Sequence, residues 1–167
     1  MPSVRISKEL TSGIYYLTFT VRNWYYIFDR HNRFQILADS LKYCQKNKGV
    51  KIYAYVFMIN HLHLIASGYD MIGFVRDFKK HTSKEMQNNI IATELGVLRL
   101  FDLGNGNYEF WSRTNMPKMI ESEEYIIQKI NYVHANPVRR QYVKKPEDWM
   151  WSSANPDSDI VIEPLVL

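Results

Sequence analysis

The sequence predicts an α+β fold, in which an antiparallel sheet carries helices on one face and an additional helix follows late in the chain. Segments with strand character alternate with segments of helical periodicity. The length of 167 residues is typical of one domain, and no repeat, low-complexity segment or Gly/Pro/Ser-rich linker divides it. We therefore expect one domain over residues 1–154, followed by an acidic and apolar tail over 155–167.

The first predicted strand covers residues 13–22, which are rich in β-branched and aromatic side chains. A helix is expected next, because residues 31–49 carry apolar side chains at helical spacing. Asn32 can cap the start of this helix, and Gly49 provides a residue at which it can end.

Two further strands and a second helix follow. Residues 50–68 hold β-branched and aromatic residues in two halves, which predicts two strands broken near residues 58–60. Residues 71–90 predict a helix with Phe74 and Phe78 on its apolar side.

Shorter strands are expected at residues 96–102 and 107–113. They flank Gly104 and Gly106, which suit a tight turn between strands.

The last helix is expected to begin after Ser122, whose side chain can cap it, and to run until Pro137 imposes an end or a kink. The order is therefore strand, helix, strand, strand, helix, strands, helix. Two strand-helix-strand halves of this kind form a ferredoxin-like plait, and the tyrosine-bearing last helix is additional to it.

Charge and cysteine content favour a cytoplasmic protein with a polyanionic partner. The net charge is +4, and residues 152–167 carry three acidic and no basic side chains, which leaves +7 on residues 1–151. An ordinary solvated surface is the competing interpretation. Cys44 is the single cysteine, so no intrachain disulfide is expected, and no apolar stretch is long enough to span a bilayer.

Two histidines stand one residue apart in the apolar stretch NHLHLIAS, residues 60–67. In a strand, His61 and His63 point to one face and the intervening leucine to the other, whereas in a helix their side chains diverge. Only a strand therefore allows both imidazoles to bind one cation. Half-buried histidines that bond to their neighbours are the structural alternative.

The last helix offers Gln128, Tyr132 and Asn136, which are spaced four apart and so lie on one stripe. An amide can complete a divalent-cation site with two imidazoles, and a phenol can attack a phosphate that the cation polarises. A buried tyrosine followed by a capping asparagine is the alternative. Tyr125 and Tyr142 are rival nucleophiles by proximity.

Several motifs occur in a characteristic order. YVFMINHLHLIASG is followed by FVRDFKKHTSKEM, FWSR, NYVHANPVRRQYV and DWMWSSA. Across residues 13–154 the chain resembles the single-tyrosine HUH transposases, and most closely the REP-associated tyrosine transposases. It departs from their usual pattern at Ile59, where proline is common, and at Arg140 and Gln141, where a small residue and glycine are common.

The resemblance implies a metal-dependent endonuclease and strand transferase that acts on single-stranded DNA, often beside a hairpin. His61, His63 and Asn136 would bind Mg²⁺ or Mn²⁺. Tyr132 would be the nucleophile that forms a 5′-phosphotyrosine and releases a 3′-hydroxyl. A homodimer that exchanges the tyrosine helix is possible, and the tail could instead favour a monomer.

DNA contacts are expected from a basic segment and from aromatic residues. The basic candidates, whose removal should weaken DNA binding and its salt dependence, are Arg76, Lys79, Lys80 and Lys84. An exposed Trp111 could stack on unpaired bases, although for Trp111, Trp149 and Trp151, each taken alone, a place in the core is the preferred interpretation. The tail could add an edge strand or cover the basic cleft.

Two other functions remain open from the sequence. A non-catalytic nucleic-acid-binding module could use the same plait with structural histidines. A metal phosphodiesterase could use water in place of tyrosine.

Overall fold

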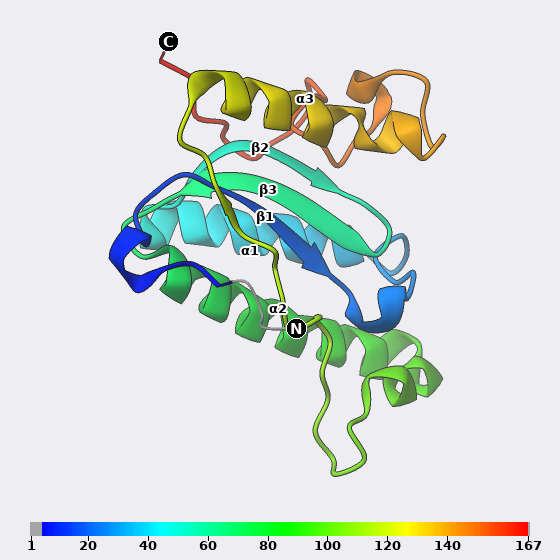
Figure 1. Ribbon diagram of the computed structural model, residues 1–167. Coiled ribbons are helices and arrows are strands. Elements are labelled where there is room, and N and C mark those ends of the chain that lie inside the picture. Colours follow the sequence, from blue (N-terminus) through cyan, green and yellow to red (C-terminus); the bar gives the residue numbers. More distant parts are fainter. Residues whose placement is uncertain (1–4, 167) are drawn as a thin grey trace.

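A computed structural model describes residues 5–166 (Figure 1). Its four strands form one sheet in the order β2-β3-β1-β4, and the pairings are antiparallel. The chain order is η1 (Lys8–Leu10), β1 (Tyr15–Thr20), η2 (Arg22–Trp24), α1 (Arg33–Lys48), β2 (Lys51–Phe57), β3 (His61–Ser67), α2 (Met71–Thr93), η3 (Leu95–Phe101), β4 (Lys118–Met119), α3 (Glu123–Arg139) and η4 (Pro146–Asp148), where η marks a 3-10 helix.

The helices lie in two layers. Figure 1 shows α1 and α2 together under one face of the sheet and α3 across the other face. The larger core lies between the sheet and the α1–α2 layer, and a smaller core that includes Tyr16, Val56, Ile65 and Val133 lies under α3. This arrangement confirms the predicted α+β plait and its additional C-terminal helix. No helix in the described part of the chain has the length and apolar character that a bilayer span requires.

Strand pairing decides which side chains face α3. The break between β2 and β3 falls at residues 58–60, as predicted, and is closed by a 2.7 Å hydrogen bond from the Met58 amide to the His61 carbonyl. On the other side of β3, Thr20 pairs with His61 and Thr18 pairs with His63. Because side chains alternate along a strand, Leu62 packs into the larger core and the histidines face the opposite way.

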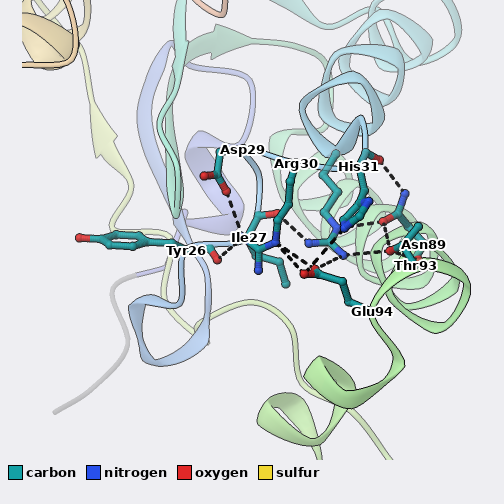
Figure 2. Close-up of polar contacts among 9 residues, drawn as sticks. Tyr26, Ile27, Asp29, Arg30, His31, Asn89, Thr93 and Glu94 are labelled. Atoms are coloured by element: carbon teal, nitrogen blue, oxygen red, sulfur yellow. Dashed lines mark hydrogen bonds and ion pairs between the residues drawn. The ribbon is translucent and has the colours of Figure 1, made fainter.

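Helix α1 starts differently from the prediction. Its apolar side chains and the left-handed Gly49 at its end (φ 62°) are as expected, but Asn32 is itself left-handed (φ 58°) and its side chain makes no capping bond. A network around Arg33, the first residue of the helix, holds this end in place. The guanidinium of Arg33 donates to the Asn89 side chain (2.8 Å) and lies 2.8 Å from a Glu94 carboxylate oxygen. Figure 2 labels these two partners, Asn89 and Glu94.

Removing the counterion of Arg33 is expected to destabilise the fold strongly. Arg33 is fully buried, and Glu94 also accepts two 3.0 Å bonds from Arg30. Glu94→Ala would leave a buried guanidinium without its carboxylate, which costs about 3 kcal/mol of unfolding free energy, the low end for a buried pair because Glu94 is partly exposed. Urea denaturation would measure this loss. Asp39→Ala, which removes a carboxylate from a solvent-exposed pair, should cost under about 1 kcal/mol; equal losses would contradict the prediction.

The region between α2 and α3 contradicts part of the prediction. Residues 95–101 form the 3-10 helix η3 instead of a strand, because α2 continues to Thr93 and the chain then turns to bury Leu98 and Phe101. Residues 107–113 contribute only isolated bridges, one of which pairs Asp102 with Tyr108 around the predicted glycine turn. The strand that completes the sheet is the short β4, which the sequence did not reveal.

Helix α3 continues past Pro137 to Arg139. A proline within a helix removes one backbone donor, but only two helical residues follow this one. The Arg140 amide then closes the end by donating to the Asn136 carbonyl. The predicted cap at Ser122 is present, with its hydroxyl accepting from the Tyr125 amide at 3.2 Å.

The tail lies along the edge of β2 without forming a strand within the described residues. The Glu163 amide donates to the Ile52 carbonyl at 2.7 Å, and Asp159 pairs with Lys42 of α1. The predicted edge strand is therefore reduced to a single backbone bond here. Residues 159–163 make their polar contacts with α1 and β2, and so this stretch lies away from the histidines.

Candidate active site

His61 and His63 lie together on the sheet face that α3 covers. Their ring centroids are 4.9 Å apart and the rings are nearly perpendicular, at 80°. Both side chains are buried. The strand geometry expected from the sequence therefore brings the two imidazoles to one place, as binding of a single cation requires.

Hydrogen bonds orient each imidazole ring. The Asn60 side-chain amide donates through Nδ2 to the Trp24 carbonyl, which directs its Oδ1 toward His61 Nδ1 at 2.7 Å. Because an amide oxygen only accepts, His61 Nδ1 carries the proton and Nε2 keeps its lone pair. His63 Nδ1 lies 2.9 Å from the Tyr16 hydroxyl and 3.0 Å from that of Thr18, and either hydroxyl can accept from it. Both rings can thus present Nε2 as a ligand.

The surroundings keep both histidines neutral. Burial, together with the positive charge of Arg140, lowers the pKa of His61 to about 4. Burial is also the main reason that the pKa of His63 falls to about 3, with smaller effects from His61 and nearby cations. A neutral imidazole is the form that binds metal ions, so at neutral pH the pair is ready to act as ligands.

Tyr132 extends from α3 beside this pair. Its ring centroid is 5.8 Å from that of His63 and 6.2 Å from that of Tyr16, and the side chain is 39% exposed. Asn136, one turn later, is buried and its amide Nδ2 has no hydrogen-bond partner among the described residues. Gln128, the third residue of the predicted stripe, is exposed. The helix thus turns Tyr132 and Asn136, but not Gln128, toward the sheet.

The other tyrosines occupy different positions. Tyr125 lies two turns before Tyr132 and contacts Lys129. Tyr142 stacks on Trp149 outside the helix. Tyr16, which the sequence did not single out, is closest to His63, but it is buried, and burial is the main cause that raises its pKa to about 12. Tyr16 is therefore held as a protonated phenol that orients His63, whereas Tyr132 combines proximity with access to solvent.

Two cations flank Tyr132 that sequence reasoning missed. The Lys129 ammonium lies 5.3 Å from the Tyr132 ring centroid and 4.8 Å from that of Tyr16, and the Arg139 guanidinium carbon lies 4.0 Å from the Tyr132 centroid. Both share the helical face of Tyr132 and Asn136, at spacings of three, four and three residues. That spacing was visible in the sequence and could have identified them.

The basic residues predicted to bind DNA lie elsewhere. Arg76, Lys80 and Lys84 are exposed on α2, across the sheet from the histidines (Figure 1). Lys79 is half-buried and donates to the Ser112 carbonyl at 3.1 Å. The structure therefore does not bring this group together with Tyr132.

Trp111 is buried, contrary to the exposed position expected for base stacking. It is 5% exposed, packs against Phe19 and Phe78, and donates from Nε1 to the Thr82 hydroxyl at 2.9 Å. The alternative that this tryptophan fills the core is therefore the correct one.

The residues present fit a divalent cation with mixed nitrogen and oxygen ligands. Within residues 5–166, no cluster combines three or more His, Cys, Asp or Glu side chains suited to a metal. An amide can supply a third protein ligand through its oxygen, and the buried Asn136 side chain on α3 carries such an oxygen. Two neutral imidazoles and one amide leave coordination positions for water and phosphate oxygens.

Neither a protein-family model nor a curated protein matches the chain. Among solved structures, the chain is similar to a REP-associated tyrosine transposase bound to a REP hairpin, with a TM-score of 0.69 and 18% identity over 92% of this chain and 82% of the other. It is also similar to a candidate transposase from Deinococcus radiodurans R1, with a TM-score of 0.50 and 16% identity over 78% of this chain and 95% of the other. The fold implied by the sequence resemblance is thereby confirmed.

Proposed function

We propose that this chain is a metal-dependent, single-stranded DNA endonuclease and strand transferase of the REP-associated tyrosine transposase type, with Tyr132 as its nucleophile. One observation carries the proposal: the accessible Tyr132 ring lies 5.8 Å from the ring of a buried, neutral histidine that is paired with a second one. The similarity of fold to transposases, one of them bound to a hairpin, supports the choice of substrate.

Each residue has a distinct role in this proposal. His61, His63 and Asn136 would hold Mg²⁺ or Mn²⁺, which when bound polarises the scissile phosphate. Asn60 and Tyr16 orient the imidazoles. Lys129 and Arg139 place positive charge beside the Tyr132 ring, where negative charge builds up as the phenol loses its proton.

The reaction exchanges one phosphodiester for another. The Tyr132 oxygen loses its proton and forms a bond to phosphorus, while the bond from phosphorus to the 3′ oxygen breaks and that oxygen takes up a proton. The products are a 5′-phosphotyrosine and a free 3′-hydroxyl. Since the bond energy is retained, a 3′-hydroxyl can attack the phosphotyrosine and join strands without ATP.

A single chain already brings these groups together. Tyr132 and His63 of the same described chain lie in ring contact. The proposal therefore needs no tyrosine from a second subunit, although exchange of α3 within a homodimer would build an equivalent site.

The decisive experiment incubates the protein with labelled hairpin-containing single-stranded oligonucleotides and Mn²⁺, followed by denaturing electrophoresis. The proposal expects a covalent protein–DNA adduct together with a free 3′ fragment. Cleavage without an adduct would indicate hydrolysis by water, and binding without cleavage would indicate a non-catalytic module; both would reject it.

Neutralising the cations around Tyr132 is expected to slow the chemistry. Lys129→Gln and Arg139→Gln should each reduce the rate of adduct formation about 10- to 100-fold, equivalent to roughly 1.4 to 2.8 kcal/mol of transition-state stabilisation. The rate is measured with saturating oligonucleotide. Lys80→Gln and Lys84→Gln on α2 serve as matched controls, which should change only affinity and its salt dependence. Equal slowing by both sets would contradict a local role.

A further inference from the structure

An exposed tryptophan lies at the end of β1, where the sequence had suggested nothing. Trp24, the last residue of η2, is 59% exposed. Its indole offers a broad aromatic face to solvent, which is the feature expected of Trp111 and absent there. A single exposed aromatic residue is common on protein surfaces. Its backbone and its neighbours distinguish this one.

The backbone that presents Trp24 is left-handed at two successive residues. Asn23 has φ 56° and Trp24 has φ 60°. Such a conformation costs a non-glycine residue roughly 1–2 kcal/mol. The Trp24 amide bonds to the Val21 carbonyl at 2.9 Å, and the Trp24 carbonyl accepts from Asn60 Nδ2 at 3.1 Å. Hydrogen bonds thus hold both the amide and the carbonyl of Trp24, and they fix the position of its backbone.

The same contacts join the indole to the histidine pair. The Trp24 ring centroid lies 6.0 Å from that of His61, at an interplanar angle of 66°. Asn60 bonds to the Trp24 carbonyl with one end of its amide and to His61 Nδ1 with the other. Trp24 therefore lies at the edge of the candidate active site, next to His61.

The surrounding charges favour an anionic ligand. Arg140 is close enough to lower the pKa of His61, and Arg139 and Lys129 act in the same way on His63. Arg22, two residues before Trp24, has a buried Nη1 without a hydrogen-bond partner in the described part of the chain. An aromatic face next to a histidine pair that feels several positive charges suits a nucleotide, which combines a base with a phosphate.

We infer that Trp24 forms a base-stacking subsite, on which an unpaired nucleobase next to the scissile phosphate lies flat. The inference rests on the proposed function. It adds that the base next to the scissile phosphate lies on the His61 side of the site. Stacking accepts any base, because every base has an aromatic face. This subsite would therefore position the DNA strand more than it would select a base sequence.

The test measures binding in a Tyr132→Phe background, so that no covalent step interferes. Fluorescence anisotropy compares a labelled oligothymidylate with an abasic oligomer of the same length, which has the phosphates but no bases. Trp24→Ala should weaken oligothymidylate binding about 5- to 150-fold, the range for loss of one stacked base. Binding of the abasic oligomer should not change.

Three further variants separate stacking from folding. Trp24→Asn, which suits a left-handed backbone, should bind as weakly as Trp24→Ala, and Trp24→Phe should recover part of the affinity. Tyr69→Ala removes an aromatic side chain that is 86% exposed beyond the far end of β3, and it should have no effect. Unchanged oligothymidylate binding by Trp24→Ala, an equal loss for both oligomers, or no oligothymidylate binding by the parent protein would each overturn the inference.

Failure of the Trp24 subsite can be distinguished from failure of the proposed function. Adduct formation is assayed separately, with Tyr132 intact. A protein that forms the adduct but binds equally well without Trp24 would refute only the subsite. A protein that shows the Trp24 effect but never forms an adduct would keep the subsite and refute the nucleophile.

Discussion

Tyr132→Phe is expected to abolish the covalent protein–DNA adduct completely. The substitution removes the one oxygen that would bond to phosphorus, and it keeps the ring that contacts Tyr16, His63 and the two cations. The fold and the affinity for DNA should therefore be retained. Denaturing electrophoresis with 5′- and 3′-labelled hairpin oligonucleotides and Mn²⁺ would measure the loss, and thermal unfolding would confirm that the variant is folded.

Three other tyrosines provide matched controls. Tyr125→Phe and Tyr142→Phe should form the adduct at the parental rate, because neither ring contacts the histidines among the contacts described. Tyr16→Phe should still form it, but more slowly, since the His63 ring would lose one of the two hydroxyls that orient it. An adduct that persists in Tyr132→Phe and disappears in Tyr125→Phe or Tyr16→Phe would transfer the role of nucleophile to that residue.

His63→Ala is expected to reduce adduct formation by at least about 1000-fold, or roughly 4 kcal/mol. The estimate follows from losing the polarisation that a bound cation gives to a phosphate, which is worth several kcal/mol. Chelation with EDTA should reduce the parent protein to the same residual rate. Titration of Mn²⁺, followed by electron paramagnetic resonance, should show weaker binding to the variant.

Histidines outside the pair test the specificity of this effect. His81 is exposed on α2, and His134 of α3 bonds to the Ser153 hydroxyl at 2.7 Å. Neither is placed to join His61 and His63, so His81→Ala and His134→Ala should leave the Mn²⁺ titration unchanged. Adduct formation by His63→Ala that remains sensitive to EDTA would show that the cation is held by other residues.

The two faces of the sheet carry different kinds of polar groups. On the α1–α2 side, the buried Arg33 ties the start of α1 to Asn89 and Glu94 at the end of α2. On the α3 side, polar groups such as His63 and Asn136 are buried, and the amide of Asn136 is left unsatisfied within the described chain. Buried polar groups without partners are costly, which is consistent with a site kept for function.

The parts of the site that depend on local periodicity could be predicted from the amino-acid sequence. Alternation along a strand placed His61 and His63 on one face, and the four-residue spacing of a helix placed Tyr132 and Asn136 on one stripe. These relations involve residues that are close in the chain. They hold wherever the element packs, and so they could be predicted before any contact between elements was known.

The packing of strands and helices determines which side chains from distant parts of the chain lie at the candidate site and which do not. Pairing of β1 with β3 brought Tyr16 and Thr18 to His63, and the turn after β1 carried Trp24 to His61. Packing against Phe19 and Phe78 removed Trp111 from the surface. Each contact joins segments that are far apart in the sequence, and the pattern around one residue gives no information about the other. The burial of a side chain likewise depends on which distant segment packs against it.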